Sequence, residues 1–123
     1  MMIAERRQFP RLEGNIPLKI CGDDFDIVTE TKNLSRNGAY CQVKKYLKPM
    51  TKLKICLMLP LKRESKIVTK KICCDGVIVR SEHIPLQDIF NVAIFFNDIP
   101  SRDSDAISEF ISSRLSVNPT PHL

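Results

Sequence analysis

The chain has 123 residues, of which 43% are hydrophobic and 27% charged, values that suit one globular domain and exclude a wholly disordered chain. No apolar run approaches the ~20 residues that a membrane-spanning helix needs. The first residues also lack the apolar segment of a secretory signal. We therefore expect a soluble, cytoplasmic protein that does not enter the membrane.

Positive charge is concentrated in the first part of the chain. The formal net charge is +5, yet residues 1–72 hold sixteen Lys and Arg against seven Asp and Glu. Between Lys44 and Lys71, ten basic residues accompany one acid, Glu64. Such a field attracts nucleotides, nucleic acids or acidic partner surfaces. For the 44–71 stretch alone, a solvated surface is the favoured interpretation.

The cysteines and histidines do not predict a metal site or a cofactor. The five cysteines form no C-x-x-C pair, and His83 and His122 have no partner at a metal-ligand spacing. We expect reduced cysteines that pack as small hydrophobic side chains. With two histidines and no recognisable catalytic motif, the sequence also favours a protein that is not an enzyme.

Alternating apolar residues predict strands through most of the chain. The clearest example places Leu53, Ile55, Leu57 and Leu59 on one face. Residues 33–38 are polar and typical of a turn. The predicted strands are residues 16–20, 25–32, 39–43, 51–59, 66–81 and 90–96.

The fifth predicted strand changes its apolar phase at Gly76. Ile72 and Cys74 precede the glycine, and Val77 and Val79 follow it in the opposite phase. A bulge at Gly76 would return both pairs to one inward face.

A helix is predicted to open at Pro100-Ser101 and to end near Arg114. Its apolar stripe is predicted to comprise Ile107, Phe110, Ile111 and Leu115. We expect an all-β domain, a six-stranded antiparallel barrel with one C-terminal α-helix. Its parts are a flexible N-terminal arm (1–14), the barrel and helix (15–115) and a disordered tail (116–123).

Two short motifs carry candidate chemistry. The arm contains R-x-x-x-R at Arg7 and Arg11, and its guanidinium groups can bind phosphate or guanine through paired hydrogen bonds. The predicted turn reads N-x-S-x-x-G, with Asn33, Ser35 and Gly38. It supplies an amide, a hydroxyl and a glycine that allows positive φ or a close approach.

With these two motifs in this order around this strand pattern, the sequence resembles the PilZ domain family of cyclic di-GMP receptors. The resemblance covers about residues 6–115, including the strand Gly76–Arg80 and the last strand, which ends at Phe96. It implies a PilZ-type six-stranded barrel with a C-terminal helix. At family level it also implies bacterial second-messenger signalling in motility or biofilm regulation, through an effector protein that remains to be identified.

The resemblance also implies the ligand-binding residues. By position, Arg7 and Arg11 would contact phosphate and guanine, while Asn33, Ser35 and Gly38 would line the barrel side of the site.

The resemblance leaves the ligand roles of several other positions undecided. Arg6 precedes the arginine pair, and family members with arginine there tend to accept two intercalated ligand molecules. A ligand role is open for Arg36 and Arg80, for which a solvated charge is the alternative. Ala93 stands where the family commonly has glycine, and no consequence for the site is expected.

Two alternatives remain at this level. A basic nucleic-acid-binding barrel fits the charge, but aromatic residues are only 7% and there is no Trp, so stacking platforms are few. A PilZ adaptor that acts without nucleotide is opposed by the intact motifs. The sequence therefore favours a cyclic di-GMP receptor that orders its arm on binding and signals to a partner protein.

Overall fold

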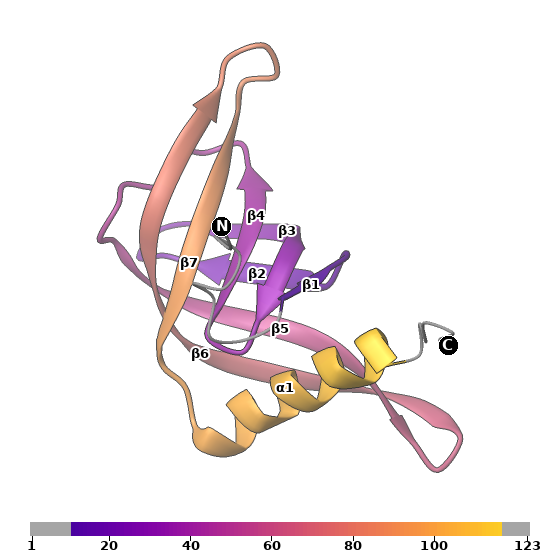
Figure 1. Cartoon of the computed structure of the whole chain (residues 1–123). Coiled ribbons are helices and arrows are strands. Elements are labelled where there is room, and N and C mark those ends of the chain that lie inside the picture. The colour runs from indigo at the N-terminus through magenta and orange to yellow at the C-terminus, as the bar shows by residue number, and fades with distance from the viewer. Residues whose placement is uncertain (1–10, 117–123) are drawn as a thin grey trace, which may run out of the picture.

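The computed structural model describes residues 11–116, which form seven strands and one helix (Figure 1). The predicted arm residues 1–10 and tail residues 117–123 lie outside the described residues. The elements are β1 (Arg11–Glu13), β2 (Pro17–Cys21), β3 (Asp26–Ser35), β4 (Gly38–Val43), β5 (Lys52–Arg63), β6 (Lys66–Ile84), β7 (Ile89–Asp98) and α1 (Ser101–Ser116).

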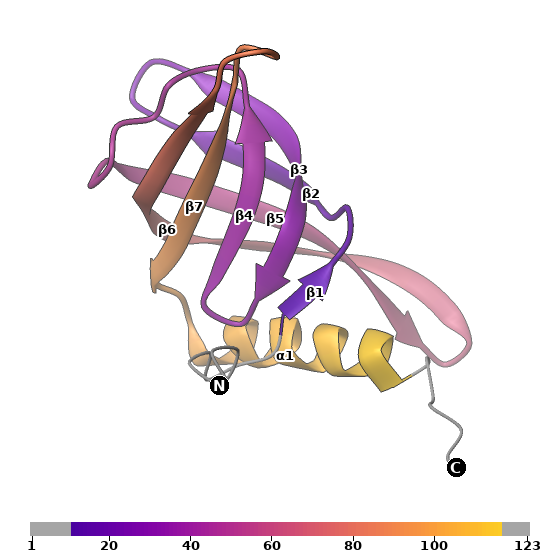
Figure 2. The same cartoon turned by 45° about the horizontal axis from the view of Figure 1, so that its top comes forward.

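Six of the strands close into a ring (Figure 2). The pairing runs β3-β2-β5-β6-β7-β4 and returns to β3 through the β3–β4 hairpin, with every pair antiparallel. This arrangement confirms the predicted six-stranded fold. The short β1 is additional, because it pairs with the end of β3 inside the segment that we expected to be an arm.

The core lies inside the ring and beneath the helix. Inward positions alternate along β5, where Leu53, Ile55, Leu57 and Leu59 are all buried, as the sequence predicts. The helix covers one end of the ring and contacts β1, β3 and β5 (Figure 1). Its Phe110 is almost fully buried; burial of such a side chain contributes about 1.5–3 kcal/mol. Among the described residues, no helix is long and apolar enough to cross a membrane.

β3 and β5 both continue beyond their predicted ends, which shortens the turns that follow them. β3 continues to Ser35, so the predicted turn over 33–38 is reduced to Arg36–Asn37. The polar segment 33–35 is held as a strand because β1 and β4 pair with its two edges. β5 likewise continues to Arg63, and its turn is the pair Glu64–Ser65, both with positive φ, as in the primed turns that match strand twist.

The predicted phase change in β6 is wrong. Burial alternates without a break through Ile72, Cys74, Gly76 and Ile78, whereas Val79 is 53% exposed. A register shift against β7 does occur between Asp75 and Gly76, so the expected irregularity is present.

The burial of the helix differs from the prediction at one residue. Ile107, Phe110 and Ile111 are buried as predicted. Leu115, which the periodicity places on the same stripe, is 45% exposed, because the last turn of the helix lies beyond the core.

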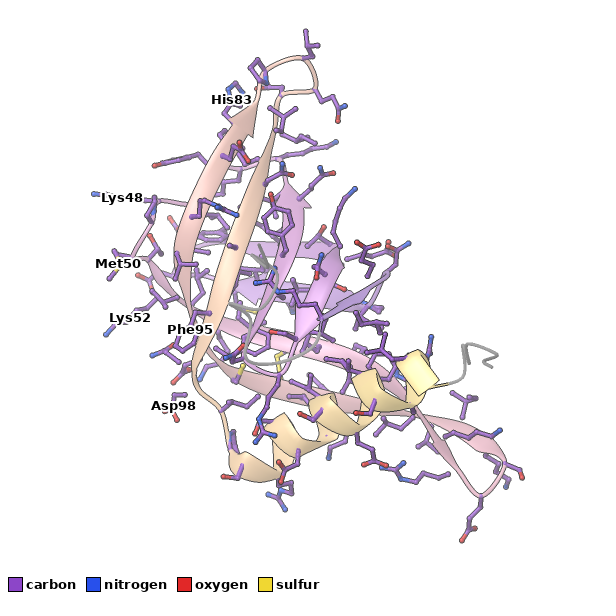
Figure 3. All side chains as sticks on the ribbon, viewed as in Figure 1. Lys48, Met50, Lys52, His83, Phe95 and Asp98 are labelled. Atoms are coloured by element: carbon purple, nitrogen blue, oxygen red, sulfur yellow. A yellow bond between two sulfur atoms is a disulfide. The ribbon has the colours of Figure 1, made fainter. Side chains whose placement is uncertain are left out.

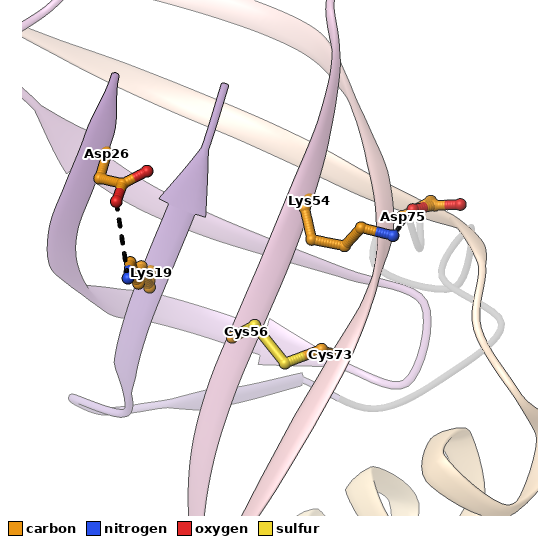
Figure 4. Close-up of a disulfide and its surroundings, with 6 residues drawn as sticks. All are labelled: Lys19, Asp26, Lys54, Cys56, Cys73 and Asp75. Atoms are coloured by element: carbon orange, nitrogen blue, oxygen red, sulfur yellow. Dashed lines mark hydrogen bonds and ion pairs between the residues drawn. A yellow bond between two sulfur atoms is a disulfide. The ribbon is translucent and has the colours of Figure 1, made fainter. Parts of the chain in front are cut away.

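The expectation of five reduced cysteines is also wrong. Cys56 and Cys73 form a disulfide between β5 and β6, with their Cα atoms 4.1 Å apart (Figure 4). They are 17 residues apart in the sequence, and only the position of the hairpin turn makes them cross-strand partners. Burial raises the pKa of the free Cys41 thiol to about 12, which keeps it protonated and unreactive at neutral pH.

The inward place of Gly76 leads to a stability prediction. A Cβ added there would lie 2.9 Å from Cγ1 of Ile55 and 3.0 Å from Cγ2 of Ile94. Such overpacking costs about 1–3 kcal/mol, more than the ~0.4–1 kcal/mol that alanine gains by restricting the unfolded chain. We expect Gly76→Ala to lower the free energy of unfolding in urea, while Lys71→Ala, at an exposed position of the same strand, leaves it nearly unchanged. Equal stability of the Gly76→Ala variant and the wild type would contradict this packing.

Candidate functional site

The N-x-S-x-x-G motif lies at the tight turn between β3 and β4. Asn33 and Ser35 end β3, and Gly38 begins β4. The Ser35 hydroxyl donates to Oδ1 of Asn37 at 3.0 Å, with the Gly38 carbonyl oxygen as a second acceptor at 3.4 Å. The side chains of Ser35 and Asn37 therefore stabilise the turn.

The same turn packs closely against β7. The Phe96 N–H donates to the Asn37 carbonyl oxygen at 2.9 Å. A Cβ at position 38 would lie 2.6 Å from the carbonyl oxygen of Ile94, an immovable backbone atom. Glycine is needed at position 38 for this close approach, not for a positive φ.

Beside this turn lies a cavity of about 190 Å³ between the end of β3 and the outer face of β4, β6 and β7. It brings together residues of both motifs, since Arg11 borders it together with Asn33, Ser35 and Gly38. The lining residues are Arg11, Asn33, Leu34, Ser35, Asn37, Gly38, Ala39, Tyr40, Val79, Arg80, Ala93, Ile94 and Phe95.

Small residues make the cavity hollow. In the strand register, Ala93 lies between Tyr40 of β4 and Arg80 of β6, and Gly38 lies opposite Phe95. The positions of Ala93 and Gly38, which have little or no side chain, are therefore surrounded by larger side chains. Ala93, for which the sequence suggested no consequence, lines the site.

A bulge in β6 brings Arg80 to this face. The register against β7 shifts between Ile78 and Arg80, leaving Val79 as the extra residue. Without the extra residue, Arg80 would have the inward phase of the buried Ile78. With it, Val79 and Arg80 are both exposed and both line the cavity.

Arg11 reaches the cavity from β1. It pairs with Ser35 across β1 and β3 and is exposed. Arg6 and Arg7, the other arginines proposed from the arm, lie outside the described residues. Of the predicted R-x-x-x-R pair, the structure therefore places only Arg11.

Asn33 has an incomplete set of hydrogen bonds. Its Oδ1 atom is buried and finds no hydrogen-bond donor among the described residues. A buried acceptor left unpaired costs about 1–3 kcal/mol. Asn33 borders the cavity, so a turn of its side chain would bring this oxygen within reach of a ligand N–H group.

Arg36, although it belongs to the motif loop, does not line the cavity in the described part of the chain. Its guanidinium group reaches helix α1 and hydrogen-bonds to Ser104, Asp105 and Ser108. The structure thus separates the two arginines that the sequence left open, because Arg80 faces the cavity and Arg36 faces the helix.

Sequence reasoning missed eight of the lining residues, among them Asn37, Tyr40, Val79 and Phe95. Tyr40 and Phe95 carry a usable signal, because each is an aromatic residue in the outward phase of its strand. Phe95 lies on β7 and is 44% exposed (Figure 3). Val79 was predicted on the inward face, and it is exposed because of the bulge between Ile78 and Arg80.

The lining residues together suit an anionic ligand with a flat ring. Arg11 and Arg80 supply positive charge, and no carboxylate is among the described residues that line the cavity. Asn33 supplies an acceptor, and Tyr40 and Phe95 supply aromatic surface. Guanidinium groups bind phosphate and also stack on planar rings.

Comparison with solved structures identifies the fold. Inhibitor of motility (MotI/DgrA) from Bacillus subtilis superposes with a TM-score of 0.80 at 20% identity, over 94% of this chain and 54% of that one. MrkH of K. pneumonia, in a complex with c-di-GMP, gives 0.68 at 17% identity, over 92% and 53%. The PilZ domain of YcgR from Escherichia coli, with c-di-GMP, gives 0.60 at 10% identity, over 94% and 99%.

This chain spans about half the length of MotI/DgrA and of MrkH, and nearly the whole of the YcgR PilZ domain. No curated protein matches the sequence. The family model described as "PilZ domain" matches residues 5–113. With this match over most of its length, the chain belongs to the PilZ domain family.

Proposed function

We propose that this protein is a receptor for cyclic di-GMP, bound in the cavity beside the β3–β4 turn. The observation that carries the proposal is that Arg11, Asn33, Ser35 and Gly38 border one cavity, with the buried Oδ1 of Asn33 left without a donor. The Watson–Crick edge of guanine presents N–H donors that would satisfy this acceptor once the Asn33 side chain turns it toward the cavity. Binding would then recover the cost of leaving the oxygen without a partner.

The charges around the cavity support the same ligand. The two phosphates of cyclic di-GMP would lie near Arg11 and Arg80, and guanine would pack against the apolar and aromatic wall that includes Phe95. Arg7 would join Arg11 in binding phosphate or guanine. With Arg6 adjacent, two intercalated ligand molecules would bind per chain, because a further guanidinium plane can stack on the outer guanine.

The nucleic-acid alternative has less support from the geometry. None of the residues that line the cavity beside the β3–β4 turn belongs to the basic stretch 44–71. Some of that positive charge is already paired. Lys54 Nζ lies 2.6 Å from Oδ1 of Asp75, and Arg63 Nη1 lies 3.5 Å from Oε2 of Glu109. The Asp75 carboxylate raises the pKa of Lys54 by hydrogen bonding and by its charge.

The proposed role is signalling rather than catalysis. The protein would act in the cytoplasm as a receptor and pass the signal to an effector protein. Arm, ligand and barrel would together form a surface that such a partner recognises.

Calorimetric titration tests the binding site directly. We expect cyclic di-GMP to bind, and GMP and a short oligonucleotide to bind weakly or not at all. Arg11→Ala, Asn33→Ala and Ser35→Ala should each weaken binding. The arginine change should cost most, because charge-assisted bonds contribute ~1.5–3 kcal/mol, or roughly ten- to a hundredfold in affinity. The endpoint also counts the ligands: two per chain are expected, and one for Arg6→Leu.

A matched control for these variants is Arg102→Ala, which removes an exposed arginine outside the cavity. Its affinity should equal that of the wild type. A wild-type protein that produces no heat with micromolar cyclic di-GMP, yet binds the oligonucleotide, would replace this proposal with the nucleic-acid one.

The arm provides a second test. Three arginines within residues 6–11 repel one another until phosphates neutralise them, so ligand binding should order the arm across the cavity. We expect amide exchange in residues 3–10, which precede β1, to be fast without ligand and slower with cyclic di-GMP. Glu13, already paired with Asn33 in β1, serves as the internal reference. Equal protection of the arm in both states would argue against this ordering.

A further inference from the structure

Arg36 connects the ligand-binding turn to helix α1. It stands in the two-residue turn, between Ser35 and Asn37, which both border the cavity. Its Nη1 donates to the Ser108 hydroxyl at 3.2 Å. Its Nη2 donates to the Ser104 hydroxyl at 3.2 Å and to Oδ1 of Asp105 at 3.1 Å.

The helix end of this connection is firmly held. Ser104 is only 7% exposed, and its hydroxyl donates in turn to the Ser101 carbonyl oxygen at 3.1 Å. Ile107 and Phe110, on the same helix, are buried in the core. In the ion pair between Arg36 and Asp105 the carboxylate is exposed to solvent. The pair by itself therefore contributes little to stability. The bonds to two serines therefore add to the attachment of Arg36 to the helix.

Lysine could not make the same attachment. The guanidinium group reaches three residues at once because its donors are spread over a rigid plane. An ammonium group is a single point charge on a flexible stem and cannot reach Ser104, Asp105 and Ser108 in the same way. The arginine side chain thus fixes the turn relative to the helix in a manner that positive charge alone does not.

We propose that Arg36 is a positioning residue, which couples ligand binding at the β3–β4 turn to the order of helix α1. This inference rests on the proposed cyclic di-GMP site and adds to it a route by which binding reaches a second surface. Because such coupling is reciprocal, contacts on α1 that do not touch the ligand would affect its affinity, and the ligand would in turn stabilise α1.

The test compares two arginines that contact the same helix. Arg36→Lys loosens the connection to the turn. Arg63→Lys is the matched control, because Arg63 reaches α1 through Glu109 at 3.5 Å from the distant β5–β6 hairpin. Ser108→Ala removes one acceptor without changing the turn itself. For each variant one would measure the affinity for cyclic di-GMP by calorimetry, the free energy of unfolding, and amide exchange with and without ligand.

We expect Arg36→Lys to bind cyclic di-GMP about tenfold more weakly and Ser108→Ala to be weakened less, while Arg63→Lys matches the wild type. In the wild type, ligand should slow exchange at residues 104–108, and in Arg36→Lys this slowing should be lost. If Arg36→Lys equals the wild type in both affinity and helix protection, the inference is overturned.

Amide exchange without ligand separates this inference from the proposed function. Asn37 and Gly38 should exchange faster in Arg36→Lys than in Arg63→Lys, whatever the ligand is. A wild type that does not bind cyclic di-GMP would overturn the proposed function. In that case faster exchange at these two amides would still support the positioning role, and unchanged exchange would contradict it.

Discussion

The candidate site depends on one close contact, where the β3–β4 turn lies against β7. Gly38 can approach the Ile94 carbonyl only because it has no Cβ, which would be 2.6 Å from that oxygen. The Phe96 N–H then bonds the Asn37 carbonyl at 2.9 Å and fixes the turn in this position. A bulky residue at position 38 would push β4 away from β7 and open the ring at the place where the cavity forms.

The remaining parts of the site follow from that contact. With β4 held against β7, the small Ala93 lies between Tyr40 and Arg80, and a hollow results. On the other side of the turn, Asn33 is held between β1 and β4 with its Oδ1 unpaired. The same turn carries Arg36 to helix α1. One tight hairpin thus contributes the cavity wall, an unused acceptor and the connection to the helix.

Much of this arrangement can be predicted from the sequence, because alternation and short motifs are local signals. The apolar phase of Leu53–Leu59 gives the central strand, and the family resemblance carried by the N-x-S-x-x-G and R-x-x-x-R motifs implies that Asn33, Ser35, Gly38 and Arg11 share one site. What alternation cannot show is how strands slide and bulge against one another. The exposure of Val79, the orientation of Arg80 and the Cys56–Cys73 pair all depend on register, which long-range pairing decides.

The same limit explains Arg36 and Ala93. Nothing local distinguishes an arginine that lines the cavity from one that bonds a helix nearly 70 residues further along the chain. Likewise, an alanine in the last strand indicates a cavity floor only once its neighbours on β4 and β6 are known.

The most direct measurement is a titration of isotope-labelled protein with cyclic di-GMP, followed by the amide resonances of the whole domain. We expect the largest shifts at the amides of Asn33, Gly38, Tyr40 and Ala93, around the cavity, and unchanged resonances in the basic stretch 44–71. Shifts confined to residues 44–71, or none at saturating ligand, would contradict the assignment of this cavity as the binding site.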